Sequence, residues 1–155
     1  MRKESFIQPD PVSWLHKFHF SIPIKVRYCE TDMLGHVNNV SYFMYFEQGR
    51  IEYFENLGLF DSMFGTEKVA VVADLECQYL AQMYRSDKVN LHVRVASIGR
   101  SSLDVEYAVV VEDRLKAAGR GAIVLIDSAT GKSTPIPEEV REAIAAFEKD
   151  GLGGI

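Results

Sequence analysis

The hydrophobic positions of the chain follow two different periods. From Phe18 to Tyr28, apolar residues alternate with polar ones, which is the pattern of a half-buried β-strand. Pro23 has no backbone N–H, so this strand is expected to lie at a sheet edge or to carry a bulge there. From Tyr42 to Leu57, the apolar positions recur with helical spacing, which predicts a helix with one buried face.

The predicted helix is rich in aromatic residues and contains a glycine on its buried face. In a helix interior, Gly49 costs about 1 kcal/mol relative to alanine. Its presence therefore predicts that another element, such as a sheet, packs very close to the helix backbone at that point. Gly58 is the expected C-terminal stop of this helix.

After Lys68 the pattern changes to long strands and short turns. Alternating apolar residues predict four strands, at 69–79, 87–98, 102–112 and 116–127. The short connections between the later strands are typical of hairpins. A short helix is expected from Pro137 to Phe147, because proline suits a first helical turn. The simplest fold is one α+β domain, in which an antiparallel sheet holds a single long helix.

Composition and charge limit which cellular compartments and which classes of binding partner we expect for this chain. The chain has 155 residues, 47% of them apolar and 25% charged, and a net charge of -5. These values are typical of a globular protein, and the acidic balance lacks the basic surface of a nucleic-acid-binding protein. No apolar run is long enough to span a bilayer, and Lys3, Glu4 and Pro9 interrupt any signal-peptide core. We expect a cytoplasmic protein that binds neither nucleic acid nor membrane.

Several catalytic motifs are missing from the sequence. Residues 131–134, GKST, resemble the end of a phosphate-binding loop, but Ile126 replaces the required glycine and Pro135 prevents the following helix. This segment is expected to be a turn. Cys29 and Cys77 have neither metal-ligand spacing nor the context of a nucleophile, and the histidines show no paired spacing. We expect free thiols and no metal site.

Candidate chemistry concentrates in residues 30–50, ETDMLGHVNNVSYFMYFEQGR. A helix that begins near residues 39–41 leaves its first N–H groups unpaired, and with the helix dipole they attract negative charge or a developing oxyanion. Asp32 is a nearby acid that could attack a carbonyl polarised by these groups, or activate water to do so. Gly35 would allow a sharp turn or a close approach to a ligand.

A purely structural role fits the same residues. Asn39 or Ser41 could simply cap the helix, and Asp32 could form an Asx-turn. Alternatively, His36, Asn38 and Asn39 supply the donors and acceptors that would position a ligand beside Asp32. Spacing alone leaves both interpretations open.

Residues 27–50, RYCETDMLGHVNNVSYFMYFEQGR, resemble the signature of 4-hydroxybenzoyl-CoA thioesterase-like proteins, the acyl-thioester hydrolases of the hotdog fold. The positions that match this signature are Asp32, Gly35, Tyr42 and Arg50. The resemblance implies a single domain over residues 1–155, with its core at about 18–147, in which a long antiparallel sheet wraps around one central helix. It also implies that two subunits pair edge to edge, with active sites at their interface.

The resemblance also assigns roles. Asp32 falls on the family's catalytic aspartate, which is a nucleophile or a general base in different members. His36 matches a histidine of the plant acyl-carrier-protein thioesterases, although the asparagine that those enzymes carry two residues after the aspartate is Leu34 here. Tyr28 matches one bacterial acyl-CoA thioesterase branch, whose histidine is replaced here by Asn39. The implied catalytic residues are Asp32 and His36. The implied substrate-binding residues are Tyr28, Gly35, Asn38, Asn39 and Tyr42.

Three classes of function remain under consideration. The first is an acyl-CoA or acyl-carrier-protein thioesterase, with no cofactor beyond the coenzyme A of its substrate. The second is a non-catalytic acyl-thioester binding module, which would have no need of Asp32. The third is a hydratase, whose Asp-x-Asn-Pro-x-His motif is incomplete at residues 32–36. The retained acid favours the hydrolase. The resemblance further implies that it acts as a homodimer or homotetramer in lipid metabolism. Residues 42–46 fit an aryl pocket, a fatty-acyl tunnel or plain core, which leaves the acyl group open.

Overall fold

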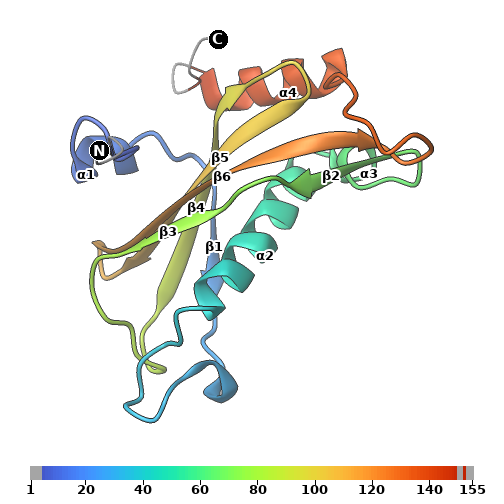
Figure 1. The fold of residues 1–155 in the computed structure, drawn as a ribbon. Coiled ribbons are helices and arrows are strands. Elements are labelled where there is room, and N and C mark those ends of the chain that lie inside the picture. The colour runs from blue at the N-terminus through green and yellow to red at the C-terminus, as the bar shows by residue number, and fades with distance from the viewer. Residues whose placement is uncertain (1–4, 150–151, 153–155) are drawn as a thin grey trace.

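The computed structural model describes residues 5–149 and Leu152. A curled antiparallel sheet wraps around one long helix, α2 (Ser41–Asn56), as Figure 1 shows. The order in the sheet is β1-β4-β5-β6-β2, and β3 also pairs with β6. The strands are β1 (Ser21–Ile24), β2 (Lys68–Val72), β3 (Glu76–Tyr79), β4 (Val89–Ile98), β5 (Ser102–Val111) and β6 (Arg114–Asp127). The predicted α+β architecture is confirmed.

Helix and sheet approach closely at two glycines. A methyl group on Gly49 would lie 2.3 Å from Leu91 Cδ2 and 2.9 Å from Val93 Cγ2, both on β4. A Cβ on Gly119 of β6 would lie 2.4 Å from the ring of Phe46 on α2. The close contact predicted at Gly49 is therefore confirmed, and a second glycine allows it from the side of the sheet.

The predicted turns are also present. Gly58 follows the last turn of α2 with a φ of 70°, as a C-terminal stop requires. The hairpin between β5 and β6 turns through Glu112 and Asp113, which both have positive φ, as a two-residue turn of this kind needs. The turn expected at GKST lies mostly before it: the N–H of Gly131 donates to the C=O of Asp127 over 2.8 Å, and Ser133 then forms an antiparallel bridge to Ile126.

Two predicted strands differ from those observed. The stretch 69–79 is two strands, because the Asp74 side chain takes a place in the ladder: its Oδ1 accepts the N–H of Ala122 at 2.7 Å. The first strand pairs only over Ser21–Ile24, since Tyr28–Glu30 forms a 3₁₀ turn (η1). Pro23 does lie on an edge strand, opposite Asn90 of β4, as its missing N–H predicted.

Three further helices flank the sheet. α1 (Pro11–Leu15), which the sequence patterns did not predict, begins where the Asp10 side chain accepts the N–H of Ser13 at 2.9 Å. Its Trp14 is fully buried in a second apolar cluster with Ala108 and Val110 of β5. The short helix α3 (Phe60–Met63) follows α2, and the predicted C-terminal helix is α4 (Glu138–Glu148). Within the described residues, no helix is both long and apolar enough to cross a bilayer.

Candidate active site

Asp32 lies in a tight loop that closes on itself. Its N–H donates to the C=O of His36 at 2.8 Å, and its C=O accepts the N–H of Gly35 at 3.0 Å. Gly35 has a φ of 80°, which favours glycine. The Oδ1 of Asp32 accepts the N–H groups of Leu34 and His36 at 2.8 and 3.0 Å. This is the Asx-turn considered above, but among the described residues no hydrogen bond reaches Oδ2.

The loop is fastened to α2 and to the connection between β3 and β4. The buried carboxylate of Glu30 accepts the hydroxyl of Tyr45 on α2 at 3.0 Å. The C=O of Glu30 accepts the N–H of Asn38 at 2.7 Å, and the N–H of Val37 donates to the C=O of Met83 at 2.8 Å. The position of Asp32 relative to the helix is therefore fixed by hydrogen bonds on both sides of its loop.

Neither Asn39 nor Ser41 caps α2, so that expectation is wrong: the position before the helix is Val40, without a side-chain cap. Asn38 satisfies the turn instead. Its Oδ1 accepts the N–H of Val40 at 2.9 Å, and its C=O accepts the N–H of Ser41 at 3.0 Å. No acceptor among the described residues meets the N–H of Asn39 or of Tyr42. These two backbone groups remain available to a ligand.

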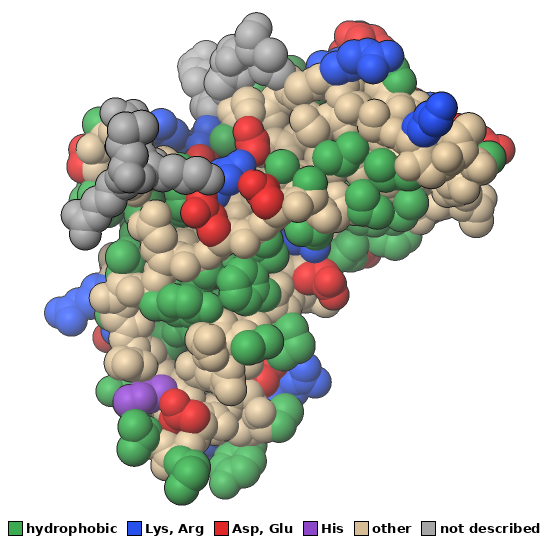
Figure 2. Space-filling model, viewed as in Figure 1, with side chains coloured by type: hydrophobic (Ala, Val, Ile, Leu, Met, Phe, Trp, Pro, Cys, Tyr) green, Lys and Arg blue, Asp and Glu red, His purple; other side chains and the backbone are tan. Residues whose placement is uncertain are grey.

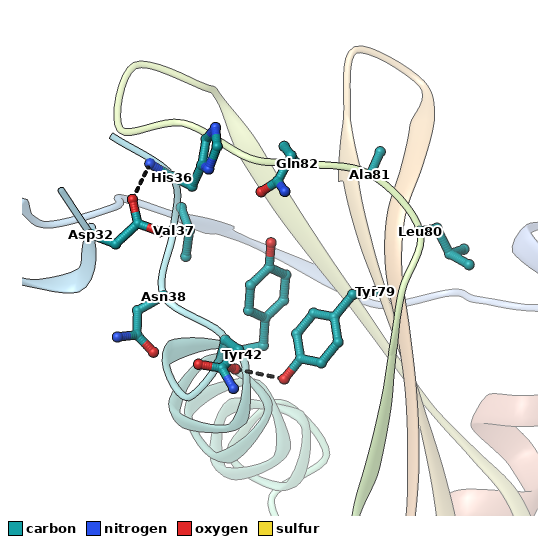
Figure 3. Close-up of a pocket in the computed structure, with 10 residues that line it drawn as sticks. Asp32, His36, Val37, Asn38, Tyr42, Tyr79, Leu80, Ala81 and Gln82 are labelled. Carbon is teal, nitrogen blue, oxygen red and sulfur yellow. Dashed lines mark hydrogen bonds between the residues drawn. The ribbon is translucent and has the colours of Figure 1, made fainter. Parts of the chain in front are cut away.

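A cavity of about 510 Å³ opens between this loop, the first turn of α2 and the end of β3 (Figure 3). Its lining consists of Asp32, His36, Val37, Asn38, Asn39, Tyr42, Tyr79, Leu80, Ala81 and Gln82. The structure thus brings five of the predicted site residues to one cavity: Asp32, His36, Asn38, Asn39 and Tyr42. Tyr42 and Tyr79 face each other edge-on, with ring centroids 5.0 Å apart.

Asp32 is the only carboxyl group among the described residues that line the cavity. Burial raises the pKa of Tyr42 to about 12 and that of Tyr79 to about 12, so both phenols are neutral at physiological pH. Burial also raises the pKa of the nearby Cys77 thiol to about 11, which disfavours the thiolate that a cysteine nucleophile needs. The site therefore has an acid but no activated thiol.

The two predicted catalytic residues meet through the backbone. The dashed line in Figure 3 joins the Asp32 carboxylate to the N–H of His36, whereas the imidazole is directed toward the β3–β4 connection. There it packs edge-on against Tyr84, with ring centroids 5.1 Å apart. The His36 ring therefore lines the cavity without orienting the Asp32 carboxylate directly.

Two predicted substrate-binding residues lie outside the cavity lining. Tyr28 is in η1 with 82% of its surface exposed, and Gly35 is at the tip of the Asp32 loop, where it serves the turn. Arg50, which also matched the family signature, is buried and donates to the hydroxyl of Tyr107 at 2.9 Å. Of the aromatic run 42–46, only Tyr42 lines the cavity. Tyr45 and Phe46 belong to the core.

The residues that the sequence did not indicate are those at the end of β3, from Tyr79 to Gln82. They form a whole wall of the cavity. The hydroxyl of Tyr79 donates to the C=O of Asn39 at 2.7 Å, which ties this wall to the start of α2. The sequence of β3 carries no signal of the contact between Tyr79 and Asn39, because this contact depends on how β3 pairs with β6.

Comparison with known proteins assigns the class. The model of the thioesterase-like superfamily matches residues 26–144, and the chain belongs to this superfamily. Its sheet-wrapped helix is the hotdog fold, as the resemblance implied. Membership in the superfamily supports thioester hydrolysis as the activity.

Individual relatives cover most of the chain. YsmA of Bacillus subtilis (strain 168), an uncharacterised protein, is 31% identical over 145 residues, which are 93% of this chain and 97% of YsmA. A thioesterase from Thermus thermophilus, solved in complex with coenzyme A and Zn, is 36% identical with a TM-score of 0.75, covering 85% of this chain and 96% of its own. The chloroplastic acyl-acyl carrier protein thioesterase ATL3 of Arabidopsis thaliana is 25% identical, covering 86% of this chain and 70% of its own.

Proposed function

We propose that this protein hydrolyses acyl-CoA thioesters in the cavity beside Asp32 and releases a carboxylic acid and coenzyme A. One observation carries the proposal: Asp32, Asn39 and Tyr42 line one cavity, and among the described residues neither Asp32 Oδ2 nor the N–H groups of Asn39 and Tyr42 have a hydrogen-bond partner. The superfamily supports a thioester substrate, and the similar Thermus thermophilus thioesterase was solved with coenzyme A. The second of these findings favours coenzyme A as the acyl carrier.

The chemistry needs only these groups. A thioester carbonyl is less stabilised by resonance than an amide, so a carboxylate beside an oxyanion site suffices. Asp32 attacks the carbonyl carbon to give an acyl anhydride that water then hydrolyses, or it takes a proton from the water that attacks. In both routes the C–S bond breaks and the thiolate of coenzyme A leaves and is protonated.

The oxyanion site in this proposal consists of the N–H groups of Asn39 and Tyr42. The N–H groups of residues 35–38 already have acceptors within the protein, which removes them as donors. An oxyanion at the start of α2 would also interact favourably with the helix dipole. His36 and Asn38 would then position the substrate from the same wall of the cavity.

We further propose that two chains pair along the edge formed by β2 and β3. The edge carries apolar side chains whose exposed fractions lie between 41% and 50%: Val71, Val72, Tyr79 and Leu80. Figure 2 shows hydrophobic side chains gathered along this face. An open edge of this kind is prone to pair with another strand. Since Tyr79 and Leu80 also line the cavity, the partner subunit would help to close the site.

Two measurements test these proposals. Release of free thiol is followed with a panel of aryl-CoA and fatty-acyl-CoA substrates of increasing chain length, beside an acyl-carrier-protein substrate and a crotonyl-CoA hydration assay. Hydrolysis of at least one acyl-CoA is expected. Binding without thiol release would support the binding module, and hydration alone a hydratase.

For the edge, sedimentation velocity is compared between the wild type, Val72→Lys and the control Val12→Lys, an exposed valine on α1. Val72→Lys is expected to shift the protein toward inactive monomer, whereas Val12→Lys stays assembled. An active monomer would contradict the shared site.

A further inference from the structure

Tyr79 holds the turn that leads into α2. It ends β3, about half of its side chain is exposed, and it lines the same cavity as Asp32. Its hydroxyl donates to the C=O of Asn39 at 2.7 Å, the dashed line that ends on its oxygen in Figure 3. Its ring packs edge-on against Tyr42, at an interplanar angle of 89°. A residue of the sheet edge thus contacts both residues whose N–H groups form the proposed oxyanion site.

The hydrogen bond from Tyr79 to Asn39 fixes the plane of one peptide unit. The C=O of Asn39 and the N–H of Val40 belong to one planar peptide unit. Tyr79 holds its oxygen, and Asn38 Oδ1 holds its N–H at 2.9 Å. The preceding unit is fixed as well, because the C=O of Asn38 accepts the N–H of Ser41 at 3.0 Å. In a trans peptide the N–H points opposite to the C=O, so the bond to the Asn38 C=O sets the direction of the Asn39 N–H. The Tyr79 bond fixes the peptide unit that follows and thereby limits rotation about Asn39.

We infer that Tyr79 is a positioning residue of the thioesterase site, which orients the turn at Asn39 and thereby the backbone donors that would bind the oxyanion. This inference rests on the proposed function. Tyr79 does not need to touch the reacting atoms, because its one hydroxyl proton is already directed at the Asn39 carbonyl. Burial, with a smaller effect from Cys77, raises its pKa to about 12, so it remains a donor at every pH used in an assay.

The test is Tyr79→Phe, which keeps the ring against Tyr42 and removes only the hydroxyl. We expect kcat to fall about tenfold, a part of the roughly 10²- to 10³-fold that one oxyanion donor contributes. KM and the shape of the pH–rate profile should stay as in the wild type, because no titrating group is lost. If the pH–rate profile of the variant instead loses its acidic or its basic limb, Tyr79 is an acid or base in the reaction. That result would overturn the positioning role.

The matched control is Tyr53→Phe, which removes a tyrosine hydrogen bond at the other end of α2, from Tyr53 to Glu148 at 2.9 Å. It should lower Tm while kcat stays unchanged. Tyr79→Phe should do the opposite, with Tm and the sedimentation coefficient close to wild type. A kcat of Tyr79→Phe within about twofold of wild type, below the roughly 0.4 kcal/mol that corresponds to that ratio, would overturn the inference.

Hydrogen–deuterium exchange separates this inference from the proposed function. Amides of residues 38–43 should exchange faster in Tyr79→Phe, and those of the remaining helix should not. If the wild type hydrolyses no acyl-CoA, the proposed function fails, and the exchange data still decide whether Tyr79 orders the turn. If the wild type is active and exchange in this segment is unchanged in the variant, only the inference fails.

Discussion

The two ends of α2 are each held by a tyrosine hydrogen bond, but in opposite surroundings. At the start, Tyr79 donates to Asn39 beside an open cavity, and Tyr79 is 46% exposed. At the end, Tyr53 donates to the carboxyl of Glu148 on α4, where neither residue is more than 1% exposed. Each end also has a carboxyl group that accepts backbone N–H groups, namely Asp32 and Glu148.

The two ends of α2 therefore differ in role: the start borders the candidate active site, whereas the end is a structural contact. Glu148 Oε2 also accepts the N–H of Val95 at 3.0 Å, where the pairing of β4 with β5 shifts register. Burial raises the pKa of Glu148, yet this buried carboxyl only joins α4 to α2 and β4. A search for acids with a raised pKa would find Glu148. The cavity and the unpaired backbone donors select Asp32, because chemistry needs room for a substrate.

The largest effect is expected from Asp32→Asn. The amide oxygen can still accept the N–H groups of Leu34 and His36, so Tm should stay within a few degrees of wild type. Without the charge, kcat should fall about 10²-fold or more, the lower range for loss of a general base. Single-turnover hydrolysis by the wild type in ¹⁸O-water detects direct attack, because label enters the Asp32 carboxylate only when water hydrolyses an anhydride at the Asp32 carbonyl. Near wild-type rates in the variant would reduce Asp32 to a turn residue.

The next largest effect is expected from Gly49→Ala, which lies between the two ends of α2. Helix propensity alone predicts that Gly49→Ala stabilises the protein by about 1 kcal/mol. The added methyl group would collide with Leu91 and Val93, so we expect a net loss of about 1–3 kcal/mol in unfolding free energy. Urea unfolding measures it, with the exposed neighbour Glu47→Ala as a control expected within about 0.5 kcal/mol of wild type. A more stable Gly49→Ala protein would show that α2 and β4 can move apart at this contact without strain.

Gly49 also illustrates how much of the fold the sequence contains. A glycine on the buried face of an aromatic helix has one main physical explanation, and the structure agrees with it. The helix, the hairpins and the turn at Gly131 were equally local, because residues a few positions apart determine them. The division of 69–79 into two strands was not, since it depends on the Asp74 carboxylate reaching Ala122 on a distant strand.

The candidate site divides in the same way. The loop from Asp32 to Asn39 lies in one segment next to the helix it precedes, so its polar residues could be recognised together. Tyr79 and Gln82 reach the cavity only through the pairing of β3 with β6, which no local pattern specifies. The burial of Glu148 could not be predicted for a related reason, because a glutamate at the end of a surface helix is expected to be exposed. Its burial depends on the irregularity in β4 beside Val95.

A smaller effect is expected from His36→Ala at the open end of α2. The imidazole lines the cavity and packs against Tyr84, so its loss should impair substrate positioning more than folding. We expect kcat/KM to fall by more than about threefold, or roughly 0.7 kcal/mol of transition-state stabilisation. His16→Ala, an exposed histidine just after α1, is the control and should leave kcat/KM unchanged. A loss below threefold would remove His36 from the site.

The smallest effect is expected from Glu148→Gln at the buried end, where it appears only as the difference between two stability curves. Burial raises the pKa of Glu148 in the folded protein above its ordinary value of 4.5. The folded state therefore holds this proton more tightly than the unfolded state, and the group's contribution to stability is lost as pH rises from about 4.5 through the raised pKa. The groups around it are Tyr53, Arg94 and His19. Glutamine imitates the protonated acid, so Tm of the variant minus Tm of the wild type should increase with pH across this window, while kcat is unaffected. Glu142→Gln, an exposed position on the same helix, should show no such trend, and a parallel pair of curves for Glu148→Gln would mean that the buried carboxyl does not titrate with folding.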